Sequence, residues 1–132
     1  MKIKSVAISV TVKDVASSSK FLMDHFSFKE KWSTNEFAYL IHDDFDFPVI
    51  FMESGMSILP EAIRNQKISG CILAFVVQDL ELEEKRLKGE NVNISAPITE
   101  DPWGERLFQV TDPNGLTIQL VQWVKPTDSQ YS

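Results

Sequence analysis

The residues best suited to chemistry in this chain occur between Asp101 and Leu120, where polar side chains alternate with aromatic rings. Trp103 and Phe108 offer flat apolar surfaces, while Arg106 and Gln119 offer hydrogen-bonding groups. Sites for small organic molecules combine apolar walls with a small number of polar anchors. This stretch therefore predicts a small-molecule binding site to which these four residues contribute.

The first half of the chain is also rich in aromatic residues. Trp32 and Tyr39 are the better pocket candidates because each ring carries a polar edge, and Phe51 and Glu53 follow on a later predicted strand. We count all four as candidate ligand contacts. For any single ring, a place in the hydrophobic core is the commoner alternative.

Catalysis is the second function class that these residues allow. Glu53 or another acid in the site could act as a general base, with Tyr39 as the proton donor. No paired acid and base motif supports this role. For Arg106, an ion pair with one of the acidic loop residues is favoured over an anion-binding role; these residues are Asp43, Asp44, Asp46, Glu100 and Asp101.

Two strands joined by a tight turn must position the second group of residues. The sequence Asp112-Pro-Asn-Gly is typical of a hairpin turn, because Pro fixes φ and Gly115 accepts a positive φ. The residues on either side alternate as strands do. Leu116, Ile118 and Leu120 should share one face, and Gln119 the other.

The order of predicted elements occurs twice along the chain. A strand over residues 3–12 precedes Asp14, which can cap a helix, and a strand over 71–77 precedes Asp79, which can cap a second helix ended by Gly89. Three strand candidates follow each helix: 29–34, 36–41 and 49–53, then 91–96, 107–111 and 117–124. We expect an α+β protein of two tandem β-α-β-β-β modules that form a curved mixed sheet around a cleft.

Length and composition agree with one folded domain. The 132 residues make a single domain spanning residues 1–132, with modules of about 3–54 and 71–124, a linker over 55–70 with room for one helical turn, and a frayed tail after 124. The net charge of −6 and scattered basic residues argue against nucleic-acid binding. The single cysteine, Cys71, cannot form an internal disulfide, which suits a reducing compartment. The sequence also lacks a signal-peptide pattern and an apolar run long enough to span a membrane, so we expect a soluble cytoplasmic protein.

This architecture, with Pro102-Trp103-Gly104, Arg106, Phe108 and the Asp112–Gly115 turn, resembles the vicinal oxygen chelate superfamily. Its members include glyoxalase I, extradiol dioxygenases, fosfomycin resistance enzymes and bleomycin resistance proteins. The resemblance covers residues 3–124. It implies two modules whose sheets curve around a cleft, and usually a dimer.

The resemblance also implies where a metal would bind in the enzymes. A His or Gln comes from the first strand of each module, seven residues before the capping Asp, and these positions hold Ala7 and Ile72. The last strands contribute Gln119 and, within one or two residues, Glu53. Because Ala and Ile cannot bind a metal, too few donors remain for an ordinary divalent site, and we expect no metal and no other cofactor.

We therefore expect a binding protein similar to the bleomycin resistance type. It would sequester a hydrophobic or aromatic ligand, such as a cationic antibiotic, in a homodimeric cleft without contact to nucleic acid or membrane. The alternative is an enzyme of the same superfamily: a lyase, a dioxygenase or a thiol transferase. We lean against an enzyme because of Ala7 and Ile72.

Overall fold

The computed structural model describes residues 1–124, which divide into two compact units, Met1–Ser69 and the unit that begins at Gly70. The first unit contains β1 (Ile8–Val12), α1 (Val15–Phe26), β2 (Lys29–Ser33), β3 (Phe37–His42) and β4 (Phe45–Glu53). The second contains β5 (Ile72–Val76), α2 (Leu80–Gly89), β6 (Ile94–Glu100), β7 (Glu105–Thr111) and β8 (Thr117–Trp123). The predicted β-α-β-β-β order is confirmed in both units.

Each unit forms its own four-stranded mixed sheet, and the predicted α+β fold of two β-α-β-β-β modules is confirmed. The strand orders are β1-β4-β3-β2 and β5-β8-β7-β6, and in each sheet the first strand pairs in parallel with the last strand of its unit. The remaining pairings are antiparallel. The two units therefore repeat the same topology as well as the same element order.

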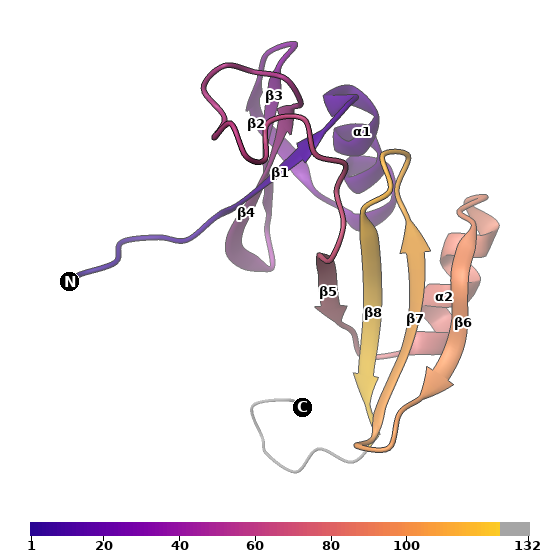
Figure 1. Cartoon of the computed structure of the whole chain (residues 1–132). Coiled ribbons are helices and arrows are strands. Elements are labelled where there is room, and N and C mark those ends of the chain that lie inside the picture. The colour runs from indigo at the N-terminus through magenta and orange to yellow at the C-terminus, as the bar shows by residue number, and fades with distance from the viewer. Residues whose placement is uncertain (125–132) are drawn as a thin grey trace. The chain divides into compact units, whose positions relative to one another are not determined.

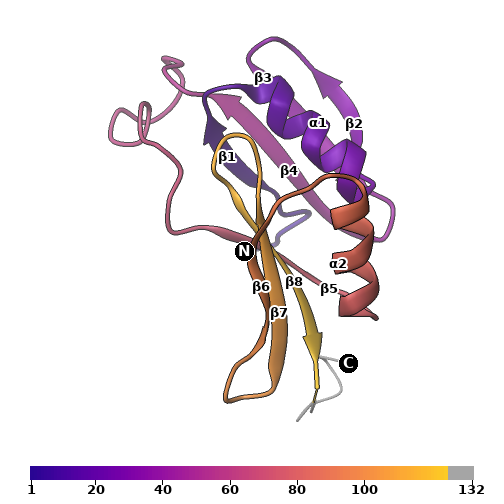
Figure 2. The ribbon, with the colours of Figure 1, turned by 90° about the vertical axis from the view of Figure 1, so that its right-hand side faces the viewer.

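One helix covers one face of each sheet. Helix α1 contacts β2, β3 and β4, and Figure 2 shows it lying across them, while α2 contacts β7 and β8 (Figure 1). Alternate strand residues point toward the helix because successive side chains of a strand face opposite sides. These buried side chains form the two cores: Val10, Leu40, Val49 and Phe51 in the first unit, and Phe108, Val110, Ile118 and Leu120 in the second.

Both helices begin directly after the predicted capping residues, Asp14 and Asp79. The Ser17 N–H donates to Asp14 Oδ1 at 3.3 Å, and the Leu82 N–H donates to Asp79 Oδ1 at 3.1 Å. Such bonds satisfy backbone donors that the first turn of a helix leaves without an intrahelical partner. The caps fix where each chain segment turns from strand to helix.

The remaining differences from the sequence prediction concern boundaries. β1 starts at Ile8 instead of residue 3, β4 extends back to Phe45, and β6 lies at Ile94–Glu100 instead of 91–96. Gly89 is the last residue of α2, but the left-handed residue that ends this helix is Asn91, with φ 63°. Residues 55–70 form turns without a helix, and the predicted frayed tail lies outside the described residues.

No helix in residues 1–124 is long and apolar enough to cross a membrane.

Candidate functional site

The face of each sheet opposite its helix, here called the helix-free face, carries most of the candidate binding residues. In the second unit the register of β7 and β8 identifies its members, because directly paired residues share a face. The pairs on this face are Glu105 with Trp123, Leu107 with Val121, and Gln109 with Gln119. Ile72 and Val76 of the edge strand β5 belong to the same face and are 53% and 61% exposed.

A polar row crosses this face of the second sheet. Gln109 Nε2 donates to Gln119 Oε1 at 2.7 Å, and Gln119 Nε2 donates to Glu105 Oε1 at 3.3 Å. The second bond spans the Leu107–Val121 pair, since that pair lies between Gln119 and Glu105 in the register. We call Gln109, Gln119 and Glu105 the polar row. It places hydrogen-bonding groups among the apolar side chains of this face.

Glu105 is the charged member of the polar row. Its pKa is raised from the ordinary value of 4.5, mainly because partial burial disfavours the carboxylate and also because Asp101 is close and negative. Asp101 Oδ1 accepts the Glu105 backbone N–H at 2.9 Å, so the turn that precedes β7 sets the position of this side chain. Both effects make ionisation of the Glu105 carboxyl less favourable, and a positive group nearby would offset them.

The first unit places an aromatic pair on its helix-free face. The rings of Trp32 on β2 and Tyr39 on β3 stack with centroids 4.6 Å apart, and Trp32 is 50% exposed. Lys31 Nζ lies 5.0 Å from the Trp32 ring centroid and 5.8 Å from that of Tyr39. This pair offers a flat surface that already attracts a cation.

Three other predicted contacts lie on the helix side of their sheets. Phe51 and Phe108 are fully buried core residues. Arg106 forms an ion pair with Glu81 of α2, and its pKa is raised mainly by this hydrogen bond. The ion-pair interpretation of Arg106 is therefore correct, although its partner is a helix residue and not one of the acidic residues of the loops. These three side chains stabilise the units and do not line the helix-free faces.

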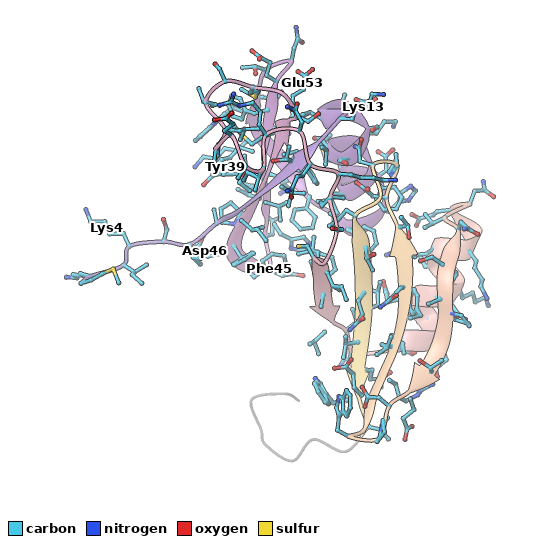
Figure 3. All side chains as sticks on the ribbon, in the orientation of Figure 1. Lys4, Lys13, Tyr39, Phe45, Asp46 and Glu53 are labelled. Carbon is cyan, nitrogen blue, oxygen red and sulfur yellow. The ribbon has the colours of Figure 1, made fainter. Side chains whose placement is uncertain are left out.

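Glu53 also lies on the helix side. It pairs with Val12 and alternates with Val49 and Phe51, whereas Tyr39 pairs with Ile50 on the opposite face of the same sheet. Figure 3 shows Glu53 and Phe45 at opposite ends of β4. Glu53 and Tyr39 are thus separated by the sheet, which argues against their use as a base and acid on one bound molecule.

The strand registers also correct the predicted last-strand metal position. Ser9 and Ala74 each lie five residues before a capping Asp, and they pair with Ile50 and Gln119 respectively. Ile50 is therefore the first-unit counterpart of Gln119, and the earlier assignment of this position to Glu53 was wrong by three residues.

The donor set at these positions does not fit a divalent metal. Ala7, Ile50 and Ile72 have no donor atoms, and Gln119 Oε1 already accepts a hydrogen bond from Gln109. Ordinary zinc or iron sites need three or four nitrogen, sulfur or oxygen ligands from the protein. Within residues 1–124, no group of three or more His, Cys, Asp and Glu side chains is arranged to hold a metal.

Trp103 lies on the turn between β6 and β7 and is 67% exposed. The next residue, Gly104, is part of the same turn. It has φ 88°, and its N–H donates to the Asp101 backbone oxygen at 3.1 Å. The turn is therefore closed and hydrogen-bonded, and it holds an indole at the surface.

A profile of the glyoxalase/bleomycin resistance protein/dioxygenase superfamily matches residues 2–120, which is most of the chain. The chain belongs to this superfamily. The match covers the first unit, the second unit as far as Leu120, and the polar row. A search among curated proteins found no match.

Several solved structures share the fold of this chain at low sequence identity. A glyoxalase/bleomycin resistance protein/dioxygenase from Nocardioides is 12% identical, with a TM-score of 0.78 over 98% of this chain and 89% of that one. Lactoylglutathione lyase from Agrobacterium tumefaciens is 12% identical, with a TM-score of 0.72 over 89% and 91%. TioX from Micromonospora sp. ML1 is 17% identical, with a TM-score of 0.67 over 92% and 100%.

Two members of the polar row, Glu105 and Gln109, were missed by the sequence analysis. The sequence contained the information needed to place them. The Asp112–Gly115 turn fixes Thr111 opposite Thr117 and hence Gln109 opposite Gln119. Counting back by twos along β7 would have placed Leu107 and Glu105 on the same face. Arg106 and Phe108, which were predicted as contacts instead, alternate with them on the helix side.

Proposed function

We propose that the protein binds a small hydrophobic or aromatic organic molecule without the help of a metal. The observation that carries this proposal is the polar row on the helix-free face of the second sheet. It places hydrogen-bonding groups beside apolar side chains, with Leu107 between Glu105 and Gln109 and the exposed Ile72 and Val76 on the same face, which is the composition of a small-molecule site. At the last-strand position where a metal-dependent relative would present a ligand, this chain has an amide oxygen already engaged by Gln109.

The aromatic pair in the first unit supports the same class of ligand. Trp32 and Tyr39 stack on each other, and the indole remains half exposed. Aromatic surfaces of this kind bind planar ligands by stacking at little entropic cost, because few side-chain torsions need to be fixed. Each unit, taken by itself, therefore carries a surface suited to an organic ligand.

A metal-dependent enzyme is the alternative, and one structural relative is named lactoylglutathione lyase. That alternative predicts about one divalent metal per chain. The donor set described above favours the binding protein, because three of the four corresponding positions carry hydrocarbon side chains.

The proposal is tested by a thermal-shift screen of aromatic compounds, including aromatic antibiotics, followed by dissociation constants for each hit. We expect a hit to raise the melting temperature, and Gln119→Leu or Trp32→Ala to weaken its binding about tenfold. Glu84→Gln on α2 is the control, because this charge lies on the helix of the second unit and is paired with Lys88. Failure of all aromatic compounds to bind, or loss of binding when metal is chelated, would contradict the proposal.

A further inference from the structure

The carboxylate of Glu105 has an unusual environment for a group on a sheet surface. Within residues 1–124, its side chain forms no ion pair, and its hydrogen-bond donor there is the amide of Gln119 at 3.3 Å. The next residue, Arg106, cannot neutralise it because its guanidinium is on the opposite face with Glu81. Asp101 adds a second negative charge beside it.

An indole lies directly across the strands from this carboxylate. Glu105 pairs with Trp123, and side chains directly opposite in an antiparallel pair have Cβ atoms about 4.5–5.5 Å apart. Leu107, the next residue of β7 on this face, continues the surface as an apolar wall. A carboxylate, an aromatic ring and an apolar surface in one place are the groups that recognise an organic cation.

We infer that Glu105, Gln119 and Trp123 form a subsite for the positively charged group of an organic ligand, an ammonium or amidinium attached to an apolar or aromatic body. The carboxylate accepts hydrogen bonds from the ligand's N–H groups, and the indole contacts its charge. Gln119, which Gln109 holds with its Nε2 toward Glu105, orients the carboxylate. This inference rests on the proposed function and specifies which ligands the site selects.

The geometry favours a cation over other ligand groups. An anion would meet two negative charges, from Glu105 and Asp101, with no basic group on the same face within the described part of the chain to offset them. A neutral ligand group would leave the negative charge of the partly buried Glu105 carboxylate unpaired. A cation compensates it, and the raised pKa of Glu105 agrees with a site that is short of positive charge.

The test uses benzamidine, a planar aromatic cation, and benzamide, which has the same shape without the charge. Dissociation constants for both are measured by NMR titration at neutral pH with wild type, Glu105→Gln, Trp123→Leu and the control Glu84→Gln. We expect wild type and Glu84→Gln to bind benzamidine about tenfold tighter than benzamide. Glu105→Gln should abolish this preference while keeping its affinity for benzamide, and Trp123→Leu should weaken both compounds.

Equal binding of the two compounds by wild type, or an unchanged preference in Glu105→Gln, would overturn the inference and leave the proposed function standing. If neither compound binds wild type, the inference is also wrong, whereas the proposed function fails only when the wider aromatic screen gives no ligand. Gln119→Leu provides a second variant that leaves the charge in place. Loss of the Gln119 hydrogen bond frees the Glu105 carboxylate, so this variant should show a smaller preference for benzamidine over benzamide. An unchanged preference would show that Gln119 has no part in the subsite.

Discussion

Asp101 and Asp112 lie at the two ends of β7 and hold their turns with the same pattern of hydrogen bonds. Each carboxylate accepts the backbone N–H groups of the second and fourth residues after it, at 3.2 and 2.9 Å for Asp101 and at 2.9 and 2.8 Å for Asp112. Both turns read Asp-Pro-x-Gly, and Gly104 and Gly115 take φ 88° and 93°. The two aspartates therefore fix both ends of the strand that carries Glu105 and Gln109.

Removing these carboxylates should destabilise the protein to different extents. Asp112 is buried, so Asp112→Ala leaves buried N–H groups without an acceptor and should lower the free energy of unfolding by about 2–4 kcal/mol. Asp101→Ala should cost about 1–2 kcal/mol, because Asp101 is partly exposed and water can replace part of its role. Urea denaturation measures both, with the exposed Asp46→Ala as the control. A larger effect at Asp101 than at Asp112 would contradict this account.

Trp103 and Trp123 should respond differently to truncation. Trp103 is 67% exposed on a turn, so Trp103→Ala should leave the melting temperature nearly unchanged and weaken binding of aromatic ligands. Trp123 is half-buried on β8, so Trp123→Ala should lower the melting temperature clearly. Differential scanning fluorimetry and ligand titration of both variants provide the comparison. Unfolding of Trp103→Ala, or its unchanged affinity, would show that the indole has only a structural role.

The raised pKa of Glu105 predicts a pH-dependent effect on stability. A carboxyl whose pKa is higher in the folded state than its ordinary 4.5 favours folding when protonated. Its contribution is therefore most favourable below the unfolded pKa and is lost as the pH rises through the folded pKa. Glu105→Gln should raise the free energy of unfolding relative to wild type at pH 7 and change it little near pH 3.

Urea denaturation of both proteins at the two pH values measures this difference. Glu84→Gln, which removes a carboxylate paired with Lys88, should not stabilise the protein at pH 7. A Glu105→Gln variant that is less stable than wild type at pH 7 would mean that the carboxylate is compensated in the folded protein.

The purified protein should contain well below one equivalent of any divalent metal. The corresponding ligand positions hold Ala7, Ile50, Ile72 and Gln119, which provide one amide oxygen among them. Inductively coupled plasma mass spectrometry after expression in metal-supplemented medium measures the content. About one equivalent of zinc, nickel, manganese or iron that withstands dialysis would favour the enzyme alternative.

We predict a homodimer in solution. Ile72 and Val76 are large apolar residues on an exposed edge of the second sheet, and surfaces of this kind are commonly covered by a second copy. Multi-angle light scattering should give about twice the chain mass of 15.0 kDa, and Val76→Lys should shift the mass toward the monomer. A wild-type mass near 15.0 kDa at micromolar concentration would refute the dimer.

Local interactions explain why the sequence predicted the elements well. The capping residues Asp14 and Asp79 and the turn from Asp112 to Gly115 act within a few residues of themselves, so their chemistry can be recognised without tertiary structure. The alternation of Leu116, Ile118 and Leu120 likewise predicts a buried face, which the structure confirms. The repeated order of these signals was sufficient to predict the fold, and together with Pro102-Trp103-Gly104, Arg106, Phe108 and the Asp112–Gly115 turn it indicated the superfamily.

The face on which each side chain lies was decided by strand pairing. A shift of one residue moves a side chain to the other face of a sheet, so Glu53 and Phe51 could be assigned only once the registers of the first sheet were known. The registers of the second sheet place Glu105 opposite Trp123 and bring Gln119 within reach of Glu105, although 14 residues separate Gln119 from Glu105 in the chain. The sequence alone determined which chemical groups are present, and the tertiary structure decided which of them share a surface.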